Sequence, residues 1–141
     1  MIYVDTSAWV ALHVSEEHTI RTQDWLEAQE VGDLACAQWV KTEYASALSF
    51  KRRRGDLNAE QFAQAHRAFA EICVAGPVWL DVLAEDFLAA AGLCVDPTTH
   101  LRASDALHLA VALRGKCDSF LSFDTVLNEN AQRVGLRVIR P

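Results

Sequence analysis

Short apolar runs alternate with longer helical patterns along this chain, and the alternation constrains the fold more than any other feature. The runs are rich in β-branched or aromatic residues, which is typical of strands buried on both faces. They lie at residues 2–5, about 33–36, 78–82, 119–123 and 136–139. Strands that alternate with helices imply a parallel sheet covered on both sides. We therefore expect an α/β fold.

The helical patterns fill the segments between these runs. We expect helices at residues 6–13, 17–30, 38–54, 59–75, 84–94, 99–114 and 125–134. Gly55 and Gly115 follow two of them directly, as helix-ending glycines do, and Asn58 can cap the helix that begins at residue 59. No repeat or linker divides the 141 residues, so we expect a single domain over residues 1–141.

The composition argues against several classes of protein. The longest largely apolar helical stretch, ALHLAVAL at 106–113, is too short to span a membrane. Asp5 interrupts the N-terminal apolar run too early for a signal peptide. The four cysteines are far apart and form no C-x-x-C pair, which predicts reduced core thiols rather than a zinc or redox site. We expect a cytoplasmic protein with no membrane segment.

The net charge of −6 argues against broad attraction to nucleic acid, but one basic run stands out. It comprises Lys51, Arg52, Arg53 and Arg54, at the end of a predicted helix. Two interpretations remain open: a solvated helix end, where cations favour the helix dipole, and a local contact for an RNA backbone. The four tryptophans can in principle stack on bases, but we expect them in the core; they are Trp9, Trp25, Trp39 and Trp79.

Two acidic residues come at the ends of predicted strands. Asp5 ends the first strand and Asp124 follows the fourth. Because parallel strands end at a common edge, where open α/β sheets have their sites, both carboxylates are expected there. The alternative is that each aspartate caps the helix that follows it. For either residue alone, both interpretations remain open.

Two more acidic residues lie inside predicted helices. Glu43 falls on an apolar stripe, three residues after Val40 and four before Ala47. Asp105 lies in LRASDALHLAVAL, a helix that is apolar nearly all round, where an unpaired buried charge is costly. The alternatives are that Glu43 lies at the solvated margin of its stripe, and that Asp105 pairs with Arg102 three residues earlier.

Convergence of all four acids would require a cation. Each close pair would repel by about 4 kcal/mol at about 4 Å and an effective dielectric of about 20, and we find no matching cluster of inward cations. Mg²⁺ or Mn²⁺ suits several carboxylates better than zinc does, and such ions commonly serve phosphodiester hydrolysis. His108 lies one turn after Asp105, but a lone histidine in an apolar helix is more often core, so we leave it out of the site.

The chain resembles the PIN-domain nucleases, and in particular the small VapC-like toxins of bacterial type II toxin–antitoxin systems. The matching motifs, in the family's order and spacing across essentially the whole chain, are YVDTSAWV, KTEYASAL, RASDALHLAVA and FLSFD. The resemblance implies a three-layer α/β/α sandwich with a parallel sheet of order 3-2-1-4-5. It also implies an Mg²⁺- or Mn²⁺-dependent endoribonuclease that leaves a 5′-phosphate and a 3′-hydroxyl.

The resemblance also implies roles for individual residues. Asp5 and Asp105 would hold the principal ion directly, while Glu43 and Asp124 would act through water or a second ion. Ser122 stands where the family often has a threonine that orients a metal-bound water; Thr6 and Ser7 either supply further hydroxyls or only cap a helix. After Asp124 the family frequently has another Asp and a Phe, whereas TVL follows here. The implied partners are an RNA substrate, a VapB-like antitoxin that blocks the site, and a second copy in a homodimer.

Other functions fit part of this pattern. A PIN-domain RNA-processing nuclease without a toxin role would have the same site. A non-nucleolytic Mg²⁺-binding phosphoacceptor signalling domain also has acids at strand ends, but it needs neither Glu43 nor Asp105, and no late strand supplies its usual lysine. A phosphatase of the haloacid-dehalogenase type would need an acid where Ser7 stands, and is rejected.

Overall fold

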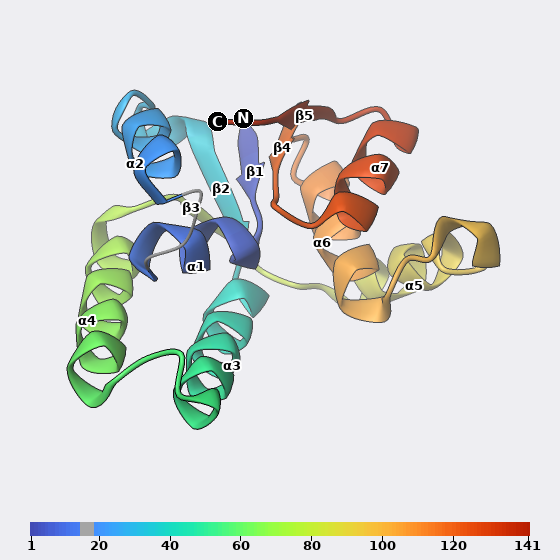
Figure 1. Ribbon diagram of the computed structural model, residues 1–141. Helices are drawn as coiled ribbons and strands as arrows, with labels where there is room; N and C mark the ends of the chain where they lie inside the picture. The colour runs from blue at the N-terminus through green and yellow to red at the C-terminus, as the bar shows by residue number, and fades with distance from the viewer. Residues whose placement is uncertain (15–18) are drawn as a thin grey trace.

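A five-stranded parallel sheet forms the centre of the computed structural model, which describes residues 1–14 and 19–141 (Figure 1). The strands are β1 (Ile2–Val4), β2 (Leu34–Ala37), β3 (Val78–Leu80), β4 (Ser119–Leu121) and β5 (Arg137–Ile139). Their order is β3-β2-β1-β4-β5, and every neighbouring pair is parallel. The predicted α/β class and the sheet order 3-2-1-4-5 are confirmed.

Helices cover both faces of this sheet. They are α1 (Thr6–His13), α2 (Thr19–Glu27), α3 (Trp39–Arg54), α4 (Ala59–Ala75), α5 (Ala84–Leu93), α6 (Ala103–Arg114) and α7 (Thr125–Arg133). Figure 1 shows α1, α3 and α4 on one side of the sheet and α6 and α7 on the other, with α5 beside α6. In the part of the chain that the structure describes, no helix is both long and apolar enough to cross a membrane.

The alternation of side chains along each strand builds two separate cores. In β1, Val4 packs with α1, α3 and α4, whereas Tyr3 packs with α6 and α7. In β4, Leu121 joins the first core and Phe120 the second. Both faces of the sheet are therefore apolar, which is why the strands read as continuous apolar runs in the sequence.

Two predicted helices differ from those observed by more than one residue. The helix expected over 99–114 begins at Ala103, because a 3₁₀ turn at Pro97–Thr99 comes first and His100 has a left-handed backbone with φ of 52°. The helix expected over 17–30 ends at Glu27, and its first two predicted residues lie outside the described part of the chain. The first difference changes the interpretation of Asp105.

The register of the central strands sets the position of the site. Val4 of β1 pairs with Leu121 of β4, so the residues that follow these strands, Asp5 and Ser122, lie level at the same edge. The backbone N–H of Asp5 continues the ladder by donating to the carbonyl oxygen of Leu121 at 2.9 Å. The polar residues after each strand are thereby brought to a common edge of the sheet.

The end of α3 offers a test of how this helix is terminated. Gly55 ends it with φ of 85°, and its N–H donates to the carbonyl oxygens of Arg52 and Lys51. We expect Gly55→Ala to lower the free energy of unfolding by about 1 kcal/mol, because an L side chain is strained in the left-handed region. Gly92, inside α5 with open space around it, is the matched control: Gly92→Ala should be neutral or stabilising. Urea denaturation measures both, and equal effects would contradict this account.

Candidate active site

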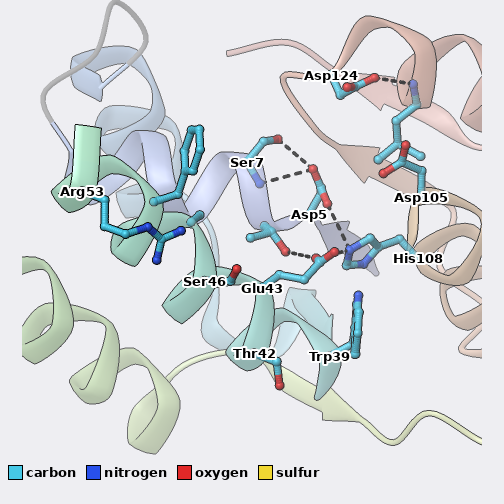
Figure 2. Close-up of a pocket in the computed structure, with 14 residues that line it drawn as sticks. Asp5, Ser7, Trp39, Thr42, Glu43, Ser46, Arg53, Asp105, His108 and Asp124 are labelled. Carbon is cyan, nitrogen blue, oxygen red and sulfur yellow. Dashed lines mark hydrogen bonds and ion pairs between the residues drawn. The ribbon is translucent and has the colours of Figure 1, made fainter. Parts of the chain in front are cut away.

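The four predicted acids line a single cavity of about 630 Å³ at the carboxyl edge of the sheet (Figure 2). Asp5 follows β1, Glu43 lies in the second turn of α3, Asp105 lies in the first turn of α6, and Asp124 begins α7. Four segments that are far apart in the sequence thus contribute one carboxylate each. Their surroundings differ, and the differences determine what each carboxylate can do.

Asp5 uses its two carboxylate oxygens for different purposes. Oδ2 accepts hydrogen bonds from the N–H of Ser7 at 3.3 Å, from the Ser7 hydroxyl at 2.7 Å and from the Ser122 hydroxyl at 2.9 Å. Oδ1 lies 3.5 Å from Nε2 of His108. Asp5 is only 5% exposed. Capping of α1 and a position in the cavity therefore coincide at Asp5, because one oxygen caps the helix while the other faces His108.

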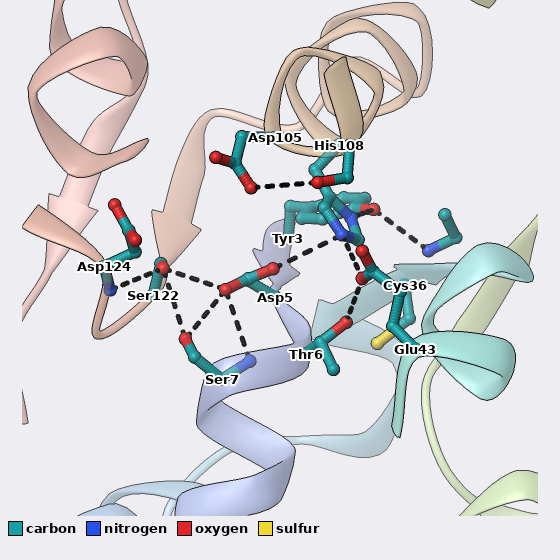
Figure 3. A network of polar contacts seen from close by, with 12 residues as sticks. Tyr3, Asp5, Thr6, Ser7, Cys36, Glu43, Asp105, His108, Ser122 and Asp124 are labelled. Atoms are coloured by element: carbon teal, nitrogen blue, oxygen red, sulfur yellow. Dashed lines mark hydrogen bonds and ion pairs between the residues drawn. The ribbon is translucent and has the colours of Figure 1, made fainter. Parts of the chain in front are cut away.

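Ser122 links the ends of the two central strands (Figure 3). Its hydroxyl is buried, donates to Asp5 and accepts the backbone N–H of Asp124 at 3.0 Å. The Ser7 hydroxyl is used similarly, donating to Asp5 and accepting the N–H of Phe123 at 2.9 Å. Each hydroxyl has one hydrogen, and both hydrogens are directed to Asp5. The contacts of Ser122 are thus those of a residue that holds a carboxylate.

Glu43 and His108 form the shortest contact between the charged groups of the site. Nε2 of His108 lies 2.6 Å from Oε2 of Glu43, and the same oxygen accepts a hydrogen bond from Thr6. On the other side of the ring, Nδ1 lies 2.7 Å from the Tyr3 hydroxyl, which accepts the N–H of Ala37. A carboxylate only accepts, so Nε2 carries the hydrogen here, and in the neutral ring Nδ1 accepts from Tyr3.

The interpretation of His108 as simple packed core is wrong. The ring is 1% exposed, as expected for core, but it faces the acidic cluster rather than apolar side chains alone. Burial opposes its protonation, but the hydrogen bond to Glu43 and the charges of Asp5, Glu43 and Asp105 outweigh burial and raise the pKa of His108. Burial also disfavours the charge of Glu43, yet the contacts of its carboxylate with His108 and Thr6 lower the pKa of that residue.

Asp105 is not a helix-interior residue, contrary to the prediction. Because α6 begins at Ala103, Asp105 lies in the first turn, where the helix dipole favours a negative charge. The two residues Arg102 and Asp105, both described, form no ion pair within 4.0 Å, although the charge of Arg102 still acts to lower the pKa of Asp105. Partial burial, followed by the charges of Asp124 and Asp5, raises the pKa of Asp105. The surroundings of Asp105 therefore disfavour its ionised carboxylate when no cation is near.

Asp124 is the most exposed of the four acids. It caps α7, since its Oδ1 accepts the N–H of Leu127 at 2.8 Å. Its carboxylate lines the cavity as well, so capping and a position in the candidate site again coincide.

Three side chains come close enough to hold one metal ion. One ligand atom each from Asp5, Glu43 and His108 lie within 4.8 Å of one another. Among the described residues, Asp105 and Asp124 are not part of such a group, although they line the same cavity. Two carboxylates and an imidazole are thus the donors that lie close together, and the prediction that Asp5 and Asp105 hold the principal ion directly stays a prediction.

The basic run divides when its side chains are followed individually. All four residues lie in the last turn of α3. Arg53 lines the cavity, and Figure 2 shows it on the opposite side from Asp124. Arg54 pairs with Asp56 at 3.4 Å, and Arg52 donates to a backbone carbonyl oxygen at 3.3 Å. The run therefore supplies one cation to the cavity wall while other members stabilise the end of the helix.

Trp39 also lines the cavity, although tryptophans were expected in the core. Its side chain is 36% exposed, at the first residue of α3, and it is one of the groups whose hydrogen bonding lowers the pKa of Glu43. Trp9, by comparison, is 2% exposed and packs in the core as predicted.

The chain is similar to known proteins in sequence and in fold. A family model described as PIN domain matches residues 2–132. Three solved structures share the fold: VapC20 of Mycobacterium tuberculosis, described as a Sarcin-Ricin loop cleaving toxin (20% identity, TM-score 0.75, covering 100% of each chain); FitAcB from Neisseria gonorrhoeae (18%, 0.74, covering 100% of this chain and 98% of that one); and a toxin–antitoxin complex from Klebsiella pneumoniae (16%, 0.69, 100% and 98%). No curated protein sequence matches significantly.

The contacts of Ser122 generate a stability prediction. Ser122→Ala removes one donor from buried Asp5 and leaves the N–H of Asp124 without its partner, so it should lower the free energy of unfolding by about 1–3 kcal/mol. Ser46→Ala, at an exposed position on the cavity wall, should change it by less than about 0.5 kcal/mol. Denaturant titration compares the two variants. If Ser122→Ala were as stable as Ser46→Ala, the hydroxyl would not hold Asp5.

Proposed function

This chain belongs to the PIN domain family, and on that premise we propose that it is a metal-dependent endoribonuclease, the toxin of a type II toxin–antitoxin module. The observation that carries the proposal is the convergence of Asp5, Glu43, Asp105 and Asp124 on one cavity at the carboxyl edge of the sheet. The family match also favours a nuclease over the phosphoacceptor signalling domain, whose chemistry needs no acids on α3 and α6.

The donors present fit a divalent cation. One carboxylate oxygen of Asp5, one of Glu43 and one ring nitrogen of His108 are mutually close, and Asp5 and Glu43 supply the oxygens that Mg²⁺ and Mn²⁺ take. The raised pKa of Asp105 gives a second reason to expect a cation. A nearby cation would relieve the repulsion of this carboxylate with Asp5 and Asp124. Such an ion, when bound, supplies a polarised water and positive charge at the phosphate oxygens.

The remaining residues of the site have roles that follow from their contacts. Ser7 and Ser122 hold Oδ2 of Asp5 while its Oδ1 faces His108, and Thr6 holds the Glu43 carboxylate through Oε2. Arg53 offers a cation to an RNA backbone that enters along α3. In this proposal the chain's own groups orient the ligand oxygens and hold the substrate.

We also propose protein partners for this chain, and the grounds for them differ from those for RNA cleavage. Solved structures with this fold include a complex described as toxin–antitoxin, which supports a protein partner. On this chain, α5 exposes Phe87 by 59% and Leu88 by 78%. Exposed apolar side chains of this size on one helix are typical of interaction surfaces. A cognate antitoxin of the VapB type and a second copy of the chain are the proposed partners.

The proposed cleavage is tested most simply at Asp105. Asp105→Asn preserves shape but removes the charge, so RNA cleavage with Mg²⁺ or Mn²⁺ should fall by about a hundredfold or more. Asp24→Asn, at an exposed position on α2 away from the cavity, should cleave like the parent protein. Sequencing of new 5′ ends in total RNA measures both, with circular dichroism as the control for folding. Unchanged cleavage by folded Asp105→Asn would contradict the proposal.

Arg53 and Arg54 form a matched pair for testing RNA contact. Arg53→Glu should weaken RNA binding and reduce the slope of log affinity against log salt by about 0.7, the value for one phosphate contact on a single strand. Arg54→Glu makes the same change in charge next to Asp56, outside the cavity lining, and should leave the slope nearly unchanged. Fluorescence anisotropy in the presence of Ca²⁺ measures the slopes. Equal slopes would mean that the run acts only as a helix end.

A further inference from the structure

The innermost donors of the site include a nitrogen that a purely acidic arrangement would not have. His108 Nε2 is 2.6 Å from Glu43 and 3.5 Å from Asp5, and the ring is almost completely buried. The nitrogen therefore lies between the two carboxylates that any ion in this group would contact. Figure 3 shows the imidazole pointing into the cluster from α6, beside both carboxylates.

Tyr3 holds the outer side of the ring. Its hydroxyl is 2.7 Å from Nδ1 and accepts the N–H of Ala37 at 3.3 Å, and its own ring stacks on Phe120 with centroids 5.2 Å apart. A hydroxyl both donates and accepts, so Tyr3 can also accept a hydrogen from Nδ1. In that tautomer the lone pair of Nε2 faces Asp5 and Glu43. A metal-ligating histidine characteristically donates its other N–H to an oxygen acceptor, and the Tyr3 hydroxyl is the oxygen in that position here.

We propose that His108 binds the divalent ion through Nε2 and thereby makes the site selective for first-row transition ions such as Mn²⁺ over Mg²⁺. The inference rests on the divalent ion of the proposed function and adds its third ligand. Mg²⁺ strongly prefers oxygen ligands and keeps its waters, whereas imidazole suits transition ions. Two carboxylates alone would discriminate weakly between the two ions, so the selectivity resides in His108.

Metal binding in the absence of RNA tests this inference. The full chain is titrated with Mn²⁺, with free ion followed by electron paramagnetic resonance, and Mg²⁺ is measured by competition. We expect Mn²⁺ to bind at least about tenfold more tightly than Mg²⁺. His108→Gln, which keeps an N–H donor for Glu43, should lose about tenfold or more in Mn²⁺ affinity and less than about threefold in Mg²⁺ affinity. Tyr3→Phe should reduce Mn²⁺ affinity in the same direction.

His66→Gln, which changes a histidine on α4 that packs against Phe62 and Tyr44, is the matched control and should leave both affinities unchanged. A variant that fails to fold does not decide the question, because the parent protein gives a direct signature. Electron spin-echo modulation of bound Mn²⁺ should show coupling to a ligated ¹⁴N nucleus. Absence of that coupling, or equal loss of both ions in His108→Gln, would overturn the inference.

The same experiments separate this inference from the proposed function. Selective Mn²⁺ binding through His108 in a protein that cleaves no RNA would leave the inference standing and remove the nuclease proposal. Metal-dependent RNA cleavage without nitrogen ligation would support the nuclease and overturn the role of His108.

Discussion

Charge compensation at the end of β1 is the constraint on which the site depends. The parallel register brings Asp5 level with the end of β4. At this position only 5% of the residue is exposed. A buried carboxylate must be hydrogen-bonded or paired. Three donors from Ser7 and Ser122 satisfy Oδ2, while His108 approaches Oδ1. Ser7 in the DTS segment after β1 and Ser122 after β4 therefore act together to compensate the charge of Asp5.

Hydrogen-bond partners also compensate the charge of Glu43, but they compensate the charge of Asp105 much less. Thr6 and His108 both contact Oε2 of Glu43, and these contacts lower the pKa of that residue despite partial burial. Asp105 accepts a long hydrogen bond from Ser104 at 3.4 Å, and its pKa is raised. The protein thus compensates its inner carboxylates with its own donors and leaves an outer one whose charge favours a cation.

Much of the fold was predictable from the sequence, because strand and helix periodicities are local properties and the two buried faces make each strand apolar throughout. The common edge of Asp5 and Asp124 followed from the same topology, whereas Glu43 was found from its place on an apolar helical stripe. His108 was missed because its partners, Tyr3 and Glu43, lie 105 and 65 residues away in the sequence. A buried histidine looks the same in the sequence whether it packs against apolar side chains or against a carboxylate.

Other misses came from boundaries and from side-chain direction. Asp105 was expected inside a helix because the 3₁₀ turn at Pro97–Thr99 merged with the following helical pattern. The basic run gave no sign that Arg53 lines the cavity while Arg54 pairs with Asp56, since neighbouring helix residues point in different directions.

The central claim is that one cation completes the cluster of carboxylates and imidazole at the edge of the sheet. Anomalous diffraction from crystals soaked in Mn²⁺ tests this claim most directly. We expect a peak bounded by Asp5, Glu43 and His108; a map with no peak among these three side chains would contradict the claim.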